Sequence, residues 1–222
     1  MNDKMKALAE EIVHGRRLKR EDGLQMFLTA DLQDLCEGAD RLRTHFNGNR
    51  VNLCTIINGK SGRCSEDCKF CNQSSFYDTA CEVHGFLEPS DILAEAKGNE
   101  AEGVDRFAIV TACRKLQGKE FANALRAFRM MHEGTALGLC ASMGLLNREQ
   151  FRELKDAGVS RYHINPEADL RFAAGRSLCE NAGEHAFQSG FSAAITGNML
   201  TTTGSTIQSD RQMLSELGRE LV

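Results

Sequence analysis

The sequence has little proline, few aromatic residues and no long apolar run. It contains two prolines, no tryptophan and 6% aromatic residues among 222 residues. A membrane-spanning helix needs roughly 18 consecutive apolar residues, and no segment approaches that length. The N-terminus also lacks the apolar core of a secretory signal peptide, because Lys4 lies in a charged stretch with helical periodicity. These absences predict a cytoplasmic protein with no membrane partner.

An excess of charge of one sign is also missing. Lysine and arginine total 27 and aspartate and glutamate 31, which gives a net charge of −4 with both signs interspersed. A nucleic-acid surface would show a basic patch or stripe, so we expect no nucleic-acid partner. Nine cysteines, an odd number without a secretion signal, fit a reducing compartment with metal-binding thiols better than a disulfide scaffold.

Three of the nine cysteines form a C-x3-C-x2-C triplet, Cys64-Ser-Glu-Asp-Cys68-Lys-Phe-Cys71. Three thiolates on one short loop can hold three irons of a cubane [4Fe–4S] cluster, which otherwise takes four cysteines. The fourth iron is then open to a small molecule, and S-adenosylmethionine (SAM) is a cofactor that carries radical chemistry. The triplet therefore predicts Cys64, Cys68 and Cys71 as ligands of a cluster with an open iron.

Two other interpretations of the triplet stay open at this point. Structural zinc also accepts cysteines two to four residues apart, but it needs a fourth Cys or His. Cys54, Cys81 and His84 form neither a second C-x2-C nor an H-x3-H pattern with it. The second alternative is that the three cysteines bind nothing. A disulfide would require an oxidising compartment, which nothing in the sequence indicates.

Strand and helix patterns alternate along the rest of the chain. Two helical stretches come first, and a β-branched apolar run then predicts a strand that ends in a turn at Asn58–Gly59, directly before the cysteine loop. We expect Ser90 to cap one later helix, and Asn147 with Gln150 to form a capping box on another. The predicted helices are 4–13, 24–36, 91–102, 119–133, 147–158, 178–189 and 206–218, and the strands are 51–57, 106–110, 136–142, 161–165, 169–173 and 192–196.

Strands that alternate with helices at this spacing predict an α/β fold with a parallel sheet. The cysteine loop follows the first strand, at the strand end where α/β barrels place their chemistry. A full barrel has eight strands, and the joint Pro166–Ala168 is too short for a parallel crossover. We therefore predict a partial (β/α) TIM-type barrel of about six parallel strands. One domain, 1–222, would comprise outer N-terminal helices (1–47), four βα units (48–167) and two last units (168–222).

Five separate segments resemble the biotin synthases, a family of radical-SAM enzymes. The segments are Asn58–Cys64, Cys71–Ser75, Tyr162–Glu167, Leu170–Arg176 and Ile195–Thr203. The resemblance runs from about residue 20 to 218, but two strand–helix units of the family are absent between Glu167 and Leu170. It thus implies an internal deletion of roughly a third of the barrel.

The resemblance implies conversion of dethiobiotin to biotin. In that family SAM is cleaved to a 5′-deoxyadenosyl radical, which abstracts hydrogen from the substrate, and an auxiliary iron–sulfur cluster gives up sulfur. The matching positions imply that Phe70 lies near the adenine of SAM and that Asn165 and Glu167 bind its ribose. They also imply that Cys140 and Arg171 are ligands of an auxiliary cluster. An electron donor of the flavodoxin or ferredoxin type and a homodimer follow from the same resemblance.

The sequence also departs from the family. Ala108 stands where the family has a second-strand cysteine, and the fifth-strand cysteine falls in the missing block. Asn165 and Glu167 could merely form a turn around Pro166, and Cys140 could be an ordinary buried thiol. We interpret His163, Cys36, Cys54, Cys81 and Cys179 as structural. Three alternatives to a biotin synthase stay open: an inactive cluster-binding protein, a radical-SAM enzyme with another small substrate, and a zinc-binding module.

Overall fold

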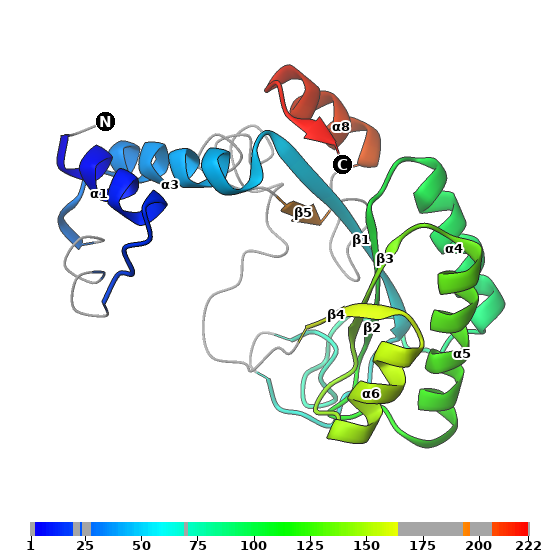
Figure 1. Ribbon diagram of the computed structural model, residues 1–222. Coiled ribbons are helices and arrows are strands. Elements are labelled where there is room, and N and C mark those ends of the chain that lie inside the picture. The colour runs from blue at the N-terminus through cyan, green and yellow to red at the C-terminus, as the bar shows by residue number, and fades with distance from the viewer. Residues whose placement is uncertain are drawn as a thin grey trace. The chain divides into compact units, whose positions relative to one another are not determined.

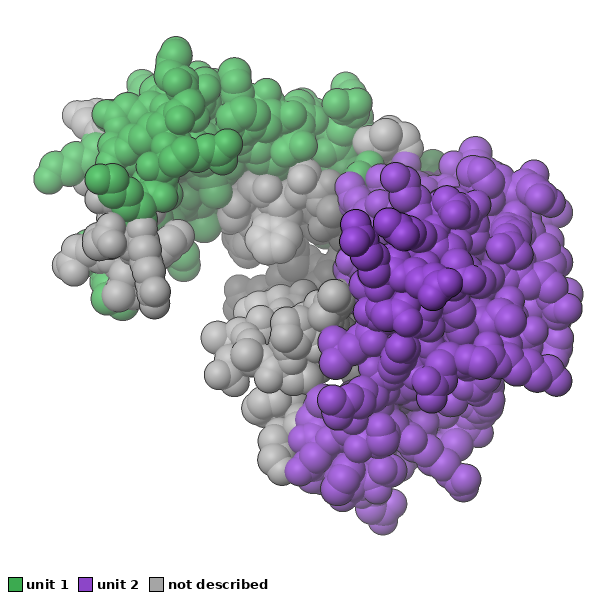
Figure 2. Space-filling view, turned by 60° about the horizontal axis from the view of Figure 1, so that its bottom comes forward, with its two compact units in different colours: residues 1–52, 176–194, 209–222 green, residues 53–175, 195–208 purple. Residues whose placement is uncertain are grey.

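The computed structural model describes residues 3–19, 23, 28–68, 71–163, 193–195 and 206–221. The chain divides into two compact units, coloured separately in Figure 2. Unit 1 comprises 1–52, 176–194 and 209–222, and unit 2 comprises 53–175 and 195–208. No helix of the described part of the chain has both the length and the apolar character needed to cross a membrane.

Four parallel strands in one sheet form the centre of unit 2. Their order across the sheet is β4-β3-β2-β1, and each neighbouring pair is parallel. The short strand β5 follows β1 in the sheet order, and β6 pairs in parallel with the first residues of β1. The α/β prediction is therefore confirmed. The strands are β1 (Arg50–Lys60), β2 (Arg106–Thr111), β3 (Gly138–Ser142), β4 (Val159–Tyr162), β5 (Ala193–Ile195) and β6 (Glu220–Leu221).

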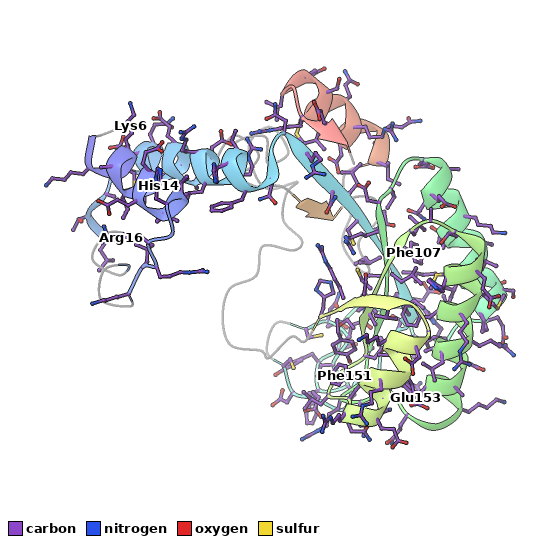
Figure 3. The ribbon with its side chains drawn as sticks, in the orientation of Figure 1. Lys6, His14, Arg16, Phe107, Phe151 and Glu153 are labelled. Carbon is purple, nitrogen blue, oxygen red and sulfur yellow. The ribbon has the colours of Figure 1, made fainter. Side chains whose placement is uncertain are left out.

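Three helices cover one face of this sheet, α4 (Pro89–Ala101), α5 (Gly118–Gly134) and α6 (Arg148–Asp156), as Figure 1 shows. Alternate residues of a strand point to opposite faces, so Phe107 and Ile109 of β2 project toward the helices. They pack in one core with Phe128 of α5, and all three are fully buried (Phe107 is labelled in Figure 3). Burial of a side chain of this size contributes about 1.5–3 kcal/mol. The other face of the sheet carries Cys54, Arg106, Ala108 and Cys140.

The first strand is longer than the sequence predicted. The expected turn at Asn58–Gly59 is wrong, because β1 continues to Lys60 and Asn58 pairs with Val110 of β2. The pairing register shifts between Asn58 and Lys60, which places a bulge at Gly59. A Cβ atom at Gly59 would lie 2.6 Å from the Cγ2 atom of Ile109. The glycine therefore allows a close approach between strands and does not mark the end of β1.

Of the two helix caps predicted from the sequence, one is confirmed and one is wrong. Asn147 and Gln150 form the predicted capping box at the start of α6. Ser90 is not the N-cap of α4, however, since that helix begins at Pro89 after Glu88. Proline suits this first position because its missing N–H has no partner inside the helix.

Unit 1 contains α1 (Asp3–Val13) and α3 (Leu32–Asn47), which pack against each other, and most of α8 (Ile207–Glu216). The prediction of one helix over 24–36 is wrong in its bounds. Asp31 is extended and accepts hydrogen bonds from two backbone N–H groups of the first turn, so α3 begins at Leu32 and runs to Asn47. The Oδ1 atom of Asp40 on α3 accepts hydrogen bonds from Arg43 at 2.8 Å and Arg219 at 3.0 Å.

Five predicted elements fall wholly or partly outside the described residues. The strand 169–173 and the helix 178–189 lie wholly outside them, and the helix 24–36 and the strands 161–165 and 192–196 lie partly outside them. Phe70, Asn165, Glu167, Arg171 and Cys179 also lie outside them.

Candidate functional site

The cysteine loop leaves the C-terminal end of β1 and is closed at its base. Ser61 and His84 form an antiparallel bridge in which each backbone N–H donates to the carbonyl of the other at 3.1 Å. Further along, the N–H of Cys64 donates to the carbonyl of Gln73 at 2.8 Å, and the N–H of Ser75 donates to the carbonyl of Cys64 at 2.9 Å. The backbone therefore holds the start of the triplet beside the residues that follow its end.

The residues after the last cysteine fasten the loop with their side chains. The Oε1 atom of Gln73 accepts hydrogen bonds from the N–H of Gly62 at 2.5 Å and from the hydroxyl of Ser61 at 3.1 Å. The hydroxyl of Ser74 donates to the carbonyl of Glu66 at 2.7 Å. Both Gln73 and Ser74 are buried. These contacts explain what the Gln-Ser-Ser segment does structurally.

The turn from β1 into the loop uses two consecutive residues with positive φ, Gly62 at 73° and Arg63 at 52°. The left-handed region costs a non-glycine residue about 1–2 kcal/mol. A Cβ at Gly62 would lie 2.6 Å from a methyl group of Val83, so that position also has no room for a side chain. The backbone is thus strained directly before Cys64, in a region where such strain often accompanies function.

The three cysteines of the triplet are half-buried, and none of the eight described cysteines forms a disulfide. The N–H of Cys71 donates to the carbonyl of Cys68 at 3.0 Å, so these two residues share one tight turn. Within the described ranges, no three Cys, His, Asp or Glu side chains are arranged so that they could hold a metal ion. The backbone therefore gathers the triplet on one loop without converging its thiols on a point.

The residues present fit an iron–sulfur group in their chemistry. Three thiols on one loop are the donor set that such clusters take. The Nε2 atom of Gln73 is buried and, among the described residues, has no hydrogen-bond partner. Its assignment as nitrogen is fixed, because the other amide atom accepts from the N–H of Gly62 and must be oxygen. A buried N–H donor without a partner is suited to a group that brings acceptor atoms to the loop.

The loop after β2 lies beside the cysteine loop. Arg114 contacts the carboxylate of Glu66 at 3.5 Å. Burial raises the pKa of the Cys113 thiol, and the nearby Cys64 adds to this effect, whereas the Thr111 hydroxyl opposes it. Lys60, at the end of β1, pairs with Glu120 at 2.7 Å. Charged and thiol groups that follow two parallel strands, β1 and β2, thus lie near one edge of the sheet, where the predicted cysteine loop also lies.

Cys140 lies elsewhere in unit 2, on the sheet face away from the helices. It is 1% exposed and interacts with Cys54 of β1 through a side-chain hydrogen bond. That bond, with help from His163 and Arg106 and against the effect of burial, lowers the pKa of the Cys140 thiol to about 6. The same contact and burial raise the pKa of the Cys54 thiol. The sequence interpretation gave Cys54 and His163 no role in this contact.

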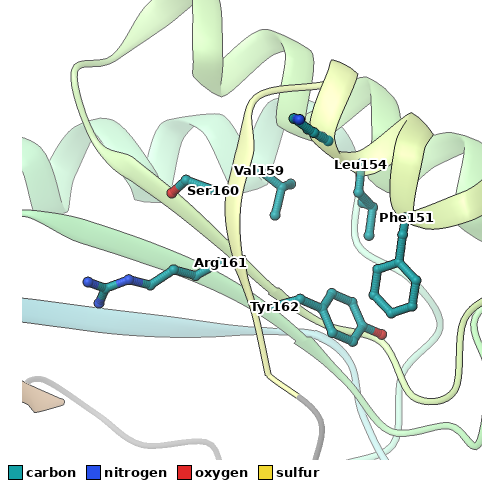
Figure 4. Close-up of a pocket in the computed structure, with 7 residues that line it drawn as sticks. Phe151, Leu154, Val159, Ser160, Arg161 and Tyr162 are labelled. Atoms are coloured by element: carbon teal, nitrogen blue, oxygen red, sulfur yellow. The ribbon is translucent and has the colours of Figure 1, made fainter. Parts of the chain in front are cut away.

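A cavity of about 240 Å³ lies between α6 and β4. Its lining includes Phe151, Leu154 and Tyr162 (Figure 4). The rings of Phe151 and Tyr162 pack edge to face, with their centroids 4.7 Å apart. None of the predicted site residues lines it. The side chain of Arg161 leaves β4 on the side opposite Phe151 (Figure 4), toward the face that carries Cys140.

Sequence comparison relates the chain to enzymes of one family. The radical SAM superfamily model matches residues 60–209. A biotin synthase from Alkaliphilus metalliredigens is 35% identical, with 98% of this chain and 99% of the relative covered. A biotin synthase from Clostridium beijerinckii is 36% identical, with 96% and 99% covered.

The alignment with the Alkaliphilus protein runs to 316 positions, whereas this chain has 222 residues. At least 94 positions, the difference between the two lengths, therefore lie opposite a gap in this chain. Because nearly the whole of both chains is covered, most of this gap is internal. This agrees with the deletion that the resemblance implied.

Solved structures support the fold. A methylornithine synthase matches with a TM-score of 0.60 at 17% identity over 95% of this chain. HydG, a maturase of the [FeFe]-hydrogenase, matches with a TM-score of 0.61 at 13% identity over 74% of this chain. The chain spans 64% of the length of the first structure and 37% of the second. On the sequence matches, the chain belongs to the radical SAM superfamily and, within it, to the family of the biotin synthases.

Proposed function

We propose that this protein is a radical-SAM enzyme of biotin-synthase type that inserts sulfur into dethiobiotin. The observation that carries the proposal is the cysteine loop: a C-x3-C-x2-C triplet, fastened by Gln73 and Ser74 at the C-terminal end of β1. Cys64, Cys68 and Cys71 would hold three irons of a [4Fe–4S] cluster, whose fourth iron would bind SAM. When bound, this cluster and SAM supply the one-electron chemistry that removes hydrogen from an unactivated carbon.

The other predicted residues have roles around this loop in the proposal. Phe70 would lie near the adenine of SAM, and Asn165 and Glu167 would bind the ribose, whose two hydroxyl groups can donate hydrogen bonds to a carboxylate. Cys140 and Arg171 would bind an auxiliary iron–sulfur cluster. We further propose a partial barrel of about six strands within one functional domain, a homodimer, a cytoplasmic location and a flavodoxin- or ferredoxin-type electron donor.

The internal gap favours a second candidate function, a protein that binds a cluster without turnover. The proposed auxiliary site and the ribose contacts flank the joint where the predicted deletion falls. A shortened barrel could hold the Cys64 loop, which is fastened mainly by its own neighbours, and still fail to position substrate. The two candidates predict the same iron binding and different SAM cleavage.

The test is an anaerobic assay on the full chain. The protein is reconstituted with ferrous iron and sulfide, reduced, and given SAM, and 5′-deoxyadenosine is measured with and without dethiobiotin. The control is the Cys68→Ala variant, and Cys36→Ala, which removes a half-buried thiol on α3 in unit 1, is the matched cysteine variant.

The first candidate would be supported if SAM cleavage is lost in the Cys68→Ala variant, is unchanged in the Cys36→Ala variant and rises with dethiobiotin. Iron binding that needs Cys68 without any cleavage would favour the second. Failure of the wild type to bind iron would overturn both.

A further inference from the structure

Gln73 is fixed in the cysteine loop by both its backbone and its side chain. Its carbonyl accepts a hydrogen bond from the N–H of Cys64 at 2.8 Å, and its Oε1 atom accepts one from the N–H of Gly62 at 2.5 Å. The first partner opens the triplet, and the second lies in the turn before it. Gln73 itself follows Cys71, the last cysteine of the triplet, by two residues and is 8% exposed. Its amide group is therefore held in one orientation beside the start and the end of the triplet.

The other polar atom of this amide, Nε2, is a buried donor without a partner among the described residues. The two amide atoms cannot be exchanged, because the N–H of Gly62 needs an oxygen as its acceptor. Nor can Nε2 turn out to solvent while Oε1 keeps its hydrogen bond to Gly62. Buried N–H groups of folded proteins nearly always have an acceptor. The donor is therefore available to a group that binds in the loop.

An iron–sulfur cluster on the triplet would bring acceptors of a suitable kind. The sulfur atoms of such clusters accept hydrogen bonds, and these bonds help to set the reduction potential. A carboxamide suits this role because it donates a hydrogen bond without bringing a charge to the buried side of the loop. A water molecule could satisfy the same donor without any contact with sulfur, and the experiment below tells the two partners apart.

We propose that the Nε2 atom of Gln73 donates a hydrogen bond to a sulfur atom of the cluster on the cysteine loop and raises the reduction potential of that cluster. The inference rests on the proposed function, and it gives Gln73 a role beyond closing the loop. Reduction adds one electron, which the electron donor supplies, and no covalent bond forms or breaks. Because the added negative charge strengthens the hydrogen bond, Gln73 stabilises the reduced state more than the oxidised state.

The experiment uses two substitutions that have the loss of Nε2 in common. Gln73→Leu removes both amide atoms and adds no charge, whereas Gln73→Glu keeps an oxygen acceptor for the N–H of Gly62. Ser74→Ala is the matched control, because it removes a different hydrogen bond that fastens the loop and leaves Nε2 in place. Each full-length chain is reconstituted anaerobically with ferrous iron and sulfide, without SAM. The midpoint potential is then measured by a redox titration followed by electron paramagnetic resonance, and circular dichroism checks the fold.

Gln73→Leu should lower the equilibrium constant for reduction of the cluster about tenfold, which lowers the midpoint potential of a one-electron couple by about 59 mV. Gln73→Glu should lower it at least as much, and Ser74→Ala should leave it at the wild-type value. A wild-type midpoint potential in either Gln73 variant overturns the inference, because Nε2 then has no contact with the cluster. An equal fall in Ser74→Ala also overturns it, because loosening of the loop then explains the change.

A second measurement detects the hydrogen bond directly. The protein is labelled with nitrogen-15 in its glutamine side chains, and the reduced cluster is studied by pulsed electron paramagnetic resonance. A weak nitrogen-15 coupling should appear in the wild type and in Ser74→Ala and should be absent from both Gln73 variants. A wild type without this coupling contradicts the inference.

Failure of the inference and failure of the proposed function can be told apart. If the cluster forms and SAM cleavage depends on Cys68, but neither Gln73 variant changes the midpoint potential, only the inference fails. If the wild type binds no iron, both fail.

Discussion

The Oε1 atom of Gln73 lies 2.5 Å from the backbone nitrogen of Gly62, so the glutamine after the cysteine triplet is bonded to the turn before it. The same side chain presents a buried Nε2 atom without a partner among the described residues. One residue thus closes the loop with its oxygen and offers a donor with its nitrogen.

Replacement of Gln73 by leucine should weaken the loop. The N–H of Gly62 would lose its acceptor in a buried setting, which costs about 1–3 kcal/mol, whereas the hydroxyl of Ser61 keeps the carbonyl of Glu82 as an acceptor at 2.6 Å. We expect a lower free energy of unfolding by chemical denaturation and less iron bound after reconstitution. Ser75→Ala is the control, because Ser75 is exposed and only its backbone joins the loop. If the Gln73→Leu variant has an unchanged free energy of unfolding and binds as much iron as the wild type, the hydrogen bonds of Gln73 do not hold the loop.

Replacement of Gly144 by alanine should be more damaging than the same change at Gly118. Both glycines have positive φ, 75° and 60°, but a Cβ at Gly144 would lie 2.1 Å from the carbonyl oxygen of Arg114 and one at Gly118 meets nothing within 4 Å. We expect Gly118→Ala to cost about 1–2 kcal/mol, from the backbone conformation alone. Gly144→Ala should cost about 2–4 kcal/mol, since overpacking is added. If thermal unfolding shows equal losses of stability in the two variants, the backbone at Arg114 moves away from the added methyl group at little cost.

Tyr162 should titrate late and stabilise the end of β4. Its hydroxyl donates to the carbonyl of Gly144 at 2.6 Å and accepts from the N–H of Met143 at 3.1 Å, and burial raises its pKa to about 12. The chain has two tyrosines, so in a Tyr77→Phe variant the phenolate absorbance should report Tyr162 alone, with a midpoint near 12. Because the folded state keeps a proton that the unfolded state loses above pH 10, stability should fall as the pH rises above 10.

The Tyr162→Phe variant supplies the matching stability measurement. It removes both hydrogen bonds and should cost about 1–2 kcal/mol, whereas Tyr77→Phe, which removes a hydrogen bond to Asp67 at a 36% exposed residue, should cost less. A midpoint near 10 in the absorbance titration would contradict the buried, bonded phenol.

Asp40 should make unit 1 less stable in acid. Burial alone would raise the pKa of this carboxyl, but hydrogen bonds from Arg43 and Arg219 outweigh it and hold the pKa below its ordinary value of 3.8. The folded state then binds the proton less readily than the unfolded state, so the stabilisation is present above pH 3.8 and is lost as the pH falls through the folded pKa. Asp40→Asn should be destabilised by about 1–3 kcal/mol at pH 7.

The difference in unfolding free energy between wild type and Asp40→Asn should therefore shrink on acidification. Asp78→Asn, at an exposed loop position, is the control. A difference that stays constant down to pH 3 would show that the ion pairs do not lower this pKa.

Local patterns predicted most of the described fold. The capping box at Asn147 and the apolar stripe of Phe121, Leu125 and Phe128 gave α6 and α5 close to their observed bounds, because those signals are local. Asn58–Gly59 misled the prediction for β1. A glycine that admits a neighbouring strand and a glycine that forms a turn look alike in a single sequence, and only the distance to Ile109 separates them.

In the candidate site, too, local features could be predicted from the sequence and contacts between strands could not. Spacing alone predicted Cys64, Cys68 and Cys71 as the proposed ligands, because ligands of one cluster on one loop would be close in sequence. The contact of Cys54 with Cys140 depends on the register of β1, β2 and β3, which joins residues 86 positions apart. Sequence period could have placed both on one face of their strands, but it could not have given the alignment of the strands. The strand β6 was missed because two residues carry no periodic signal.

The two bridges of the cysteine loop, Cys64 with Ser74 and Ser61 with His84, are nested one inside the other. The inner bridge encloses all three cysteines, and the segment 76–83 lies between the inner and outer closures. A single inserted residue between Cys64 and Ser74 would change the spacing of the three cysteines. Length changes within 76–83 leave that spacing unchanged but act on the loop through Tyr77 and Thr79, whose hydroxyls donate to Asp67 and to the carbonyl of Asn72. Phe76, which is exposed, is thus a position for a side-chain spin label next to the proposed cluster that needs no inserted residue.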